Sequence, residues 1–145
     1  MDKETYRFIH PAGIESFSFR FSGRALQWLC GTTRDDDGRE ICGFVLFGDL
    51  LARMAPVAGE GKGFRRPLTL SAGQAQYSEE QLSAQWNMGR KRIRNMLETL
   101  ADLGLVATRR SRVASFMTFP CLLGWGTAES GRIPNNPFIS EQREK

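Results

Sequence analysis

The sequence predicts a single α+β domain that is mostly helical and ends in a β-hairpin. Three observations support this fold class. Between residues 78 and 104, apolar residues recur at the spacing of two short amphipathic helices. Residues 105–119 then contain two segments rich in Val, Thr and Phe on either side of a short turn, which is the pattern of a hairpin. The 145 residues, with 41% apolar and 25% charged residues, are typical of one ordinary domain with a buried core.

Residues 1–40 are predicted to form an N-terminal extension with one short strand and one short helix. Phe17, Phe19 and Phe21 alternate with polar residues, which is the period of a strand with one buried face. We expect these rings to pack in the core or in a dimer interface. A platform on which single-stranded nucleic acid stacks is the alternative interpretation. The helix is predicted at residues 23–30.

The middle of the chain and its C-terminal end complete the predicted domain. The apolar run over residues 41–55 predicts a buried helix, whereas residues 56–67 are rich in Gly and Pro and predict a loop. A short strand is expected at residues 68–70. We therefore expect one domain over residues 1–123, followed by a polar, extended C-terminal tail over residues 124–145.

A helix, a tight break and a second helix form the clearest pattern in the chain. Ser78 and Gln81 make a capping box, in which side chain and backbone satisfy each other's free N–H groups at a helix start. Trp86 closes this first helix, and we expect its ring in the core. After the break, a second helix is predicted over residues 90–103, with Gly104 in the C-cap position. One buried stripe is expected along it: Ile93, Met96, Leu97, Leu100 and Leu103.

The basic residues are concentrated in one part of the chain. The net charge is +4. Residues 86–112 hold seven basic and two acidic residues, a net charge of +5, so the remainder of the chain sums to −1. A local cationic patch of this kind is what anionic partners bind, although an ordinary solvated helix face is the alternative.

The predicted second helix separates its charges along its length. On a helical wheel, Lys91 and Asn95 face outward at the N-terminal half, whereas Glu98 and Asp102 face outward at the C-terminal half. This polarity suits a helix that enters the DNA major groove with its N-terminal residues. Lysine can donate to guanine and asparagine can pair with adenine, so Lys91 and Asn95 are the predicted base contacts.

The arginines around these two residues are predicted to bind phosphates, which hold the register of a complex without reading its sequence. Those of the helix are Arg90, Arg92 and Arg94. A second group lies at the expected tip of the hairpin, where it would reach the DNA backbone or the minor groove beside the helix. This group consists of Arg109, Arg110 and Arg112.

Residues 70–119 resemble a winged helix-turn-helix DNA-binding domain. The similar pattern occurs in bacterial regulators and in the N-terminal domains of phage and plasmid replication initiators, with a helix-turn-helix core at 78–104 here and a wing at 105–119. Two positions depart from it: Gly89 stands where the family usually has a capping Ser, and Ser83 replaces a small Ala. The matching positions are Gly73, Gln74, Ser78, Leu82, Arg90, Ile93, Arg94, Leu97, Leu100, Gly104, Leu105 and Val106.

The sequence offers no set of residues for catalysis or for a metal. The three cysteines form no CxxC pair and His10 is the single histidine, so the usual zinc-ligand spacings are absent. The glycine-rich residues 59–63 lack the phosphate-loop spacing. Residues 35–38 resemble part of a calcium loop that lacks its first and last acids. We predict no enzyme, no cofactor and no metal.

No apolar run approaches the ~20 residues of a membrane helix, and the N-terminus lacks the apolar core of a signal peptide. We therefore expect a cytoplasmic protein without a membrane partner or an evident small-molecule substrate. The predicted function is sequence-dependent binding of duplex DNA, with a homodimer as one arrangement. Two biological roles remain open: a transcriptional regulator, and a replication or maintenance factor, of a bacterium or a mobile element. The alternative is a winged helix that serves as a protein-interaction module without DNA binding.

Overall fold

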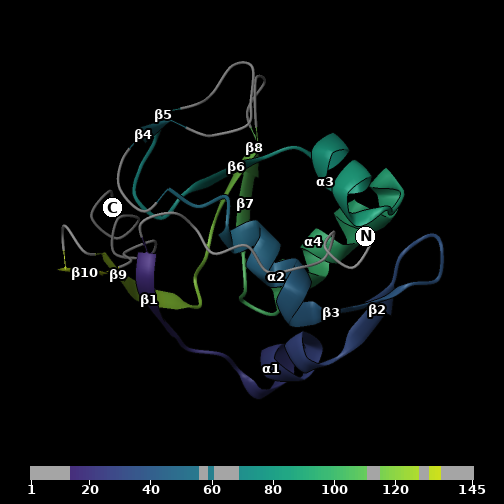
Figure 1. Cartoon of the computed structure of the whole chain (residues 1–145), viewed down its shortest axis with the longest axis horizontal. Helices are drawn as coiled ribbons and strands as arrows, with labels where there is room; N and C mark the ends of the chain where they lie inside the picture. The colour runs from purple at the N-terminus through teal and green to yellow at the C-terminus, as the bar shows by residue number, and fades with distance from the viewer. Residues whose placement is uncertain (1–13, 56–58, 61–68, 111–114, 128–130, 135–145) are drawn as a thin grey trace.

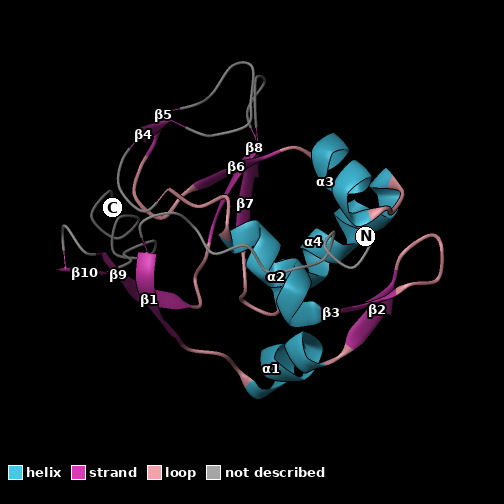
Figure 2. Ribbon diagram, viewed as in Figure 1, coloured by secondary structure: helices cyan, strands magenta, loops and turns pink. Residues whose placement is uncertain are grey.

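The computed structural model describes residues 14–55, 59–60, 69–110, 115–127 and 131–134. Within these residues the chain forms four helices and ten strands, and helices and strands contribute similar numbers of residues (Figure 1, Figure 2). The strands form four small sheets. The prediction of a mostly helical winged helix-turn-helix is therefore wrong. It failed because many strands are only two to four residues long and carry no periodic pattern.

The N-terminal strand belongs to a sheet with the C-terminal end of the described chain. β1 (Ile14–Phe19) pairs antiparallel with β9 (Leu122–Thr127), and β9 also pairs with β10 (Gly131–Pro134). The expected N-terminal extension is thus joined to the rest of the fold through this sheet. The residues assigned to a polar tail from 124 onward include part of β9, where Trp125 is only 2% exposed.

A short helix and a hairpin follow β1. α1 (Gly23–Cys30) begins after Ser22, and the predicted helix at 23–30 is confirmed. β2 (Thr32–Arg34) and β3 (Glu40–Cys42) pair antiparallel. Asp35 closes their loop, because its buried carboxylate accepts hydrogen bonds from the backbone N–H groups of Asp37 and Arg39, both at 2.9 Å.

α2 (Gly43–Leu51) lies near the centre of the molecule (Figure 1). It is shorter than the helix predicted over 41–55, because Ile41 and Cys42 are the end of β3. Gly43 lets α2 approach α1 closely: a Cβ atom at this position would lie 2.4 Å from the carbonyl oxygen of Trp28. Two further strands, β4 (Gly59–Glu60) and β5 (Thr69–Leu70), pair with each other.

The remaining elements confirm the helix, break, helix and hairpin predicted from the sequence. α3 (Glu79–Trp86) and α4 (Arg90–Asp102) follow β6 (Ala75–Tyr77). β7 (Ala107–Arg110) and β8 (Ser115–Thr118) form the antiparallel hairpin, and β6 adds to β8 to give a sheet in the order β6-β8-β7. α3 and α4 lie beside this sheet, at one side of the molecule (Figure 1).

The ends of α3 and α4 follow from local residue chemistry. The Ser78 hydroxyl accepts a hydrogen bond from the Gln81 N–H at 3.0 Å, so the predicted N-cap is confirmed. Asn87 ends α3 in the left-handed region, at φ 54°. Gly89 caps α4 without any side-chain hydrogen bond, and Gly104 follows α4 with φ 77°, a conformation that favours glycine.

The predicted core residues of the two helices are buried except Leu103, which is only partly buried. Ile93, Leu97 and Leu100 are at most 5% exposed. Trp86 is 1% exposed, and its indole N–H donates to the Asp49 carboxylate at 2.7 Å, which ties α3 to α2. Among the described helices, none combines the length and the apolar character that crossing a bilayer requires.

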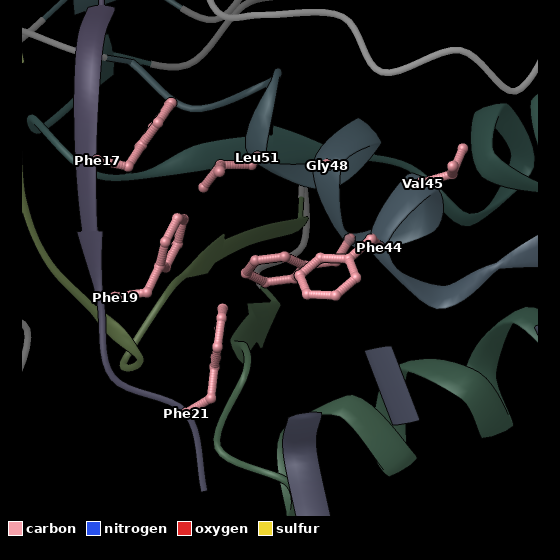
Figure 3. A pocket seen from close by; sticks show the side chains of 8 residues that line it. Phe17, Phe19, Phe21, Phe44, Val45, Gly48 and Leu51 are labelled. Carbon is pink, nitrogen blue, oxygen red and sulfur yellow. The ribbon is translucent and has the colours of Figure 1, made fainter. Parts of the chain in front are cut away.

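An apolar cavity of about 290 Å³ lies between β1 and α2 (Figure 3). Phe17, Phe19 and Phe21 are half-buried along one wall, and neighbouring rings stack with centroids 5.6 and 5.2 Å apart. They pack against the core, as one of the two sequence interpretations expects. We call this cavity the phenylalanine pocket; its lining residues are Phe17, Phe19, Phe21, Phe44, Val45, Phe47, Gly48 and Leu51.

Candidate nucleic-acid interface

The N-terminal half of α4 presents the side chains that the wheel places outward. Arg90, Lys91, Arg94 and Asn95 are all exposed. Ile93, on the opposite side of the helix, is fully buried and holds α4 against the core. The exposed surface of this half-helix is thus cationic, with one amide that is free to pair with a planar partner.

The hairpin adds two further cations. Arg109 and Arg110 are exposed on β7, whereas the predicted wing residue Arg112 lies outside the described residues. Arg110 binds the carboxylate of Glu79, which Arg94 of α4 also binds, so the structure brings the helix and the hairpin together. Neighbouring residues of a strand point to opposite faces of the sheet, so Arg109 lies on the other face of the hairpin from Arg110. We call the exposed cations of α4 together with Arg110 the arginine face, which consists of Arg90, Lys91, Arg94 and Arg110.

Glu79, the first residue of α3, is the partner that joins the two groups. Its Oε1 accepts a hydrogen bond from Nε of Arg94 at 2.9 Å, and its Oε2 accepts one from a terminal nitrogen of Arg110 at 3.0 Å. Arg90 forms a longer ion pair with Oε1 at 3.8 Å. Sequence reasoning missed this residue. The available signal was an acid directly after the N-cap, on the helix that precedes the cationic one.

Tyr77 lies beneath this cluster. It is 3% exposed, and burial raises the pKa of its hydroxyl, whereas the nearby Arg110 opposes the rise. The hydroxyl is hydrogen-bonded to the side chains of Ser115 and Thr108, which belong to the two strands of the hairpin. The Tyr77 ring is thus packed just before the start of α3, where it supports the position of the hairpin.

Arg92 differs from its neighbours on α4. Its guanidinium donates to the hydroxyl of Thr33 at 3.1 Å and to the backbone oxygen of Arg34, and it forms an ion pair with Asp36 at 3.5 Å. All three partners belong to β2 or to the loop that follows it. Because Arg92 already binds this loop, we leave it out of the arginine face.

The β2–β3 loop also contacts the break between α3 and α4. The Asn87 side chain donates to the Asp37 carboxylate at 2.7 Å, and the backbone N–H of Asp36 donates to the Asn87 oxygen at 2.9 Å. Two exposed acids therefore stand beside the start of α4. This loop fixes the position of the break, and its negative charge limits the cationic surface on that side.

The charges of the arginine face are uneven. Its four exposed cations face one carboxylate, Glu79, whose side chain is only 10% exposed and pairs with three of them, so these five side chains carry a net charge of +3. Glu98 and Asp102 are exposed at the other end of α4, as predicted. The cationic end of the helix therefore lies beside the hairpin, and the acidic end lies away from it.

The described part of the chain contains no cluster of three His, Cys, Asp or Glu side chains that could hold a metal ion. Cys30 is exposed and Cys121 is buried. Burial raises the pKa of the Cys121 thiol to about 12, so this thiol remains protonated at neutral pH.

Comparison of the chain with protein families, with curated proteins and with solved structures found no match. The arrangement of the residues themselves is therefore the basis for a functional interpretation.

Proposed function

We propose that this protein binds duplex DNA in a sequence-dependent way through the arginine face. One observation carries the proposal. Exposed cations from α4 and from β7 converge on Glu79, while the exposed acids of α4 lie at its other end. A surface that is cationic over two adjacent elements matches the regular phosphate charge of a duplex.

In the proposed complex, α4 enters the major groove, which is wide enough for one helix. Lys91 and Asn95 are exposed and one helical turn apart, so both can face the same base edges. Arg90 and Arg94 flank them and bind phosphates, and Arg109 and Arg110 bind the backbone or the minor groove beside the helix.

The proposal includes the resemblance of residues 70–119 to winged helix-turn-helix domains of bacterial regulators and replication initiators. It places the protein in the cytoplasm of a bacterium, where it acts as a transcriptional regulator or as a replication or maintenance factor of the cell or a mobile element. A homodimer on a symmetric site is compatible with this role, since operators are often pseudo-palindromic.

The test is replacement of Arg90, Lys91 and Arg94 together by Ala, measured by gel shift on duplexes selected from a random pool. We expect duplex binding to be lost while the far-ultraviolet circular dichroism is unchanged, because all three side chains are exposed. A control replaces Arg20 and Arg24, which are also exposed and lie outside α3, α4 and β7. It removes two positive charges from elsewhere on the protein, and should retain sequence-dependent binding. Normal binding by the first triple variant would reject the proposal.

The alternative function is a protein-interaction module, in which the arginine face docks an acidic protein. The exposed acids Asp36 and Asp37 beside the start of α4 favour it, because they would repel phosphates on that side. The two functions differ in their salt dependence. A DNA-binding protein loses affinity with a slope of about −0.9 in log[salt] per neutralised phosphate, whereas the module would bind duplexes no better than ~10⁻⁴ M.

A further inference from the structure

We infer that Glu79 is a positioning residue of the proposed DNA interface: it binds arginines of α4 and β7 at the same time and fixes their spacing for neighbouring phosphates of a duplex. The inference rests on the proposed function and adds a residue that makes no contact with DNA itself. It also assigns a ligand class, phosphodiesters, to the donors that the three arginines retain.

The relative exposure of the four side chains places the carboxylate below the guanidinium groups. The Glu79 side chain is 10% exposed, whereas those of Arg90, Arg94 and Arg110 are 59%, 51% and 63% exposed. A phosphate that approaches from solvent therefore meets the arginines before it meets the acid. Glu79 can hold the cations from beneath without occupying the surface that a ligand would use.

The hydrogen-bond geometry leaves donors free on the outer side. Arg94 binds Glu79 through Nε, so neither of its terminal nitrogens is used in this contact. Arg110 uses one terminal nitrogen for Glu79. A guanidinium carries five N–H donors, so both side chains keep several for phosphate oxygens.

Two physical effects make the acid important for the array. Three guanidinium groups drawn to one place repel one another, and the carboxylate among them offsets that repulsion. Arginine side chains also lose rotamer freedom when they bind a ligand, and a side chain already held in position loses less. Both effects predict tighter phosphate binding in the presence of Glu79.

The opposite role would be that of a competing counter-ion, in which Glu79 weakens phosphate binding by neutralising the arginines. The two roles predict opposite signs for the substitution Glu79→Gln. Glu80 provides the matched control, because it is the next residue of the same helix turn, carries the same charge and is exposed. No ion pair is recorded for Glu80 with any residue that the structure describes.

The experiment compares Glu79→Gln and Glu80→Gln in the full chain, with affinity for a selected duplex measured across a series of salt concentrations. Both variants lose one negative charge, which raises the net charge of the protein by one, so Glu80→Gln should bind the duplex slightly tighter than wild type. Glu79→Gln should bind on the order of tenfold weaker than Glu80→Gln, with a salt slope shallower by about 1, because the arginines no longer meet phosphates together. Equal or tighter binding by Glu79→Gln would overturn the inference.

A second comparison does not depend on the folding of Glu79→Gln. Arg110 contacts Glu79, whereas its exposed neighbour Arg109 points to the other face of the hairpin and lacks that contact. Arg110→Ala should therefore cost several-fold more duplex affinity than Arg109→Ala, although both remove one charge. Equal losses of duplex affinity for the two variants would contradict the role of Glu79 in positioning Arg110.

A double-substitution background separates positioning from a general effect on the fold. When Arg94 and Arg110 are both Ala, only the longer ion pair with Arg90 remains, so the difference in affinity between Glu79→Gln and Glu80→Gln should shrink, and an undiminished difference would reject positioning. Failure of the wild-type protein to bind any duplex would reject the proposed function together with this inference. Binding by wild type with equal affinities for the two glutamine variants would reject only the role of Glu79.

Discussion

The arginine face is a cluster of basic side chains, and the phenylalanine pocket is a cluster formed mainly by aromatic rings. The two clusters differ in how far the fold buries their side chains. Each gathers side chains from segments that are distant in sequence. The arginine side chains are more than half exposed in each of the three recorded ion pairs with Glu79. The phenylalanine rings are mostly half-buried, and Phe47 makes edge contacts with Phe19, Phe21 and Phe119.

The difference in burial determines what each cluster contributes. Removing apolar surface from water stabilises a fold by about 25 cal/mol per Å², whereas an exposed ion pair contributes only about 0–1 kcal/mol. The phenylalanine pocket therefore stabilises the protein, and substitutions there act on folding. The arginine face can change with little effect on folding, which leaves its residues available for a partner.

The largest expected effect concerns the pocket. Phe47→Ala should lower the free energy of unfolding by about 3–5 kcal/mol, because a buried ring in contact with three others is lost. Phe44 lines the same pocket but is 41% exposed, so Phe44→Ala should cost less than about 1 kcal/mol. Urea denaturation monitored by tryptophan fluorescence measures both. Similar losses of unfolding free energy for the two variants would show that the exposure of a ring in this pocket does not determine its contribution to stability.

An intermediate effect is expected at alkaline pH from Cys121, a buried thiol whose pKa is raised from 9.0 to about 12. The unfolded chain releases this proton above pH 9 while the folded protein retains it, so its contribution is complete below pH 9 and is lost as pH rises towards 12. The loss should reach about 1.4 kcal/mol at pH 10.

The control for this prediction is the exposed Cys30. Unfolding free energies at pH 8, 9 and 10 should fall less steeply for Cys121→Ala than for wild type, whereas Cys30→Ala should keep the wild-type slope. A Cys121→Ala variant with an unchanged slope would assign the alkaline loss to other groups. Tyr77 is one such group, although Arg110 opposes the rise in its pKa.

The smallest expected effect tests whether Arg92 belongs with the arginine face. Arg92→Ala should lower the free energy of unfolding by about 1 kcal/mol, because three contacts to β2 and its loop are lost. The adjacent exposed Lys91 should cost less than about 0.5 kcal/mol when replaced by Ala. Duplex affinity should show the reverse order, with the larger loss for Lys91→Ala. Equal losses of duplex affinity for Arg92→Ala and Lys91→Ala would show that Arg92 also belongs to the DNA interface.

Local chemistry was sufficient to predict α3, α4 and the β7–β8 hairpin. The N-cap at Ser78, the glycine after α4 and the stripe through Ile93, Leu97 and Leu100 all act within a few residues of one another. Such signals can be read from the order of residues because the interacting groups are neighbours along the chain. The exposure of Lys91 and Asn95 followed from the same helical period.

The errors concern contacts between distant segments. β1 finds its partner in β9, more than ninety residues later, and nothing in either strand specifies that pairing. Glu79 and Arg110 are 31 residues apart, and Arg92 reaches Thr33 across 59 residues. These contacts form only because packing brings α3, α4, β2 and β7 together.

The sequence by itself determined the cationic helix, its caps, its inward and outward sides and the hairpin beyond it, because periodicity and capping act over a few residues. The tertiary structure alone decided that the fold is as rich in strands as in helices, since short strands gain stability only from partners elsewhere in the chain. It also decided which arginines act together. A single carboxylate gathers Arg90, Arg94 and Arg110, whereas Arg92, of the same residue type on the same helix, binds a loop instead.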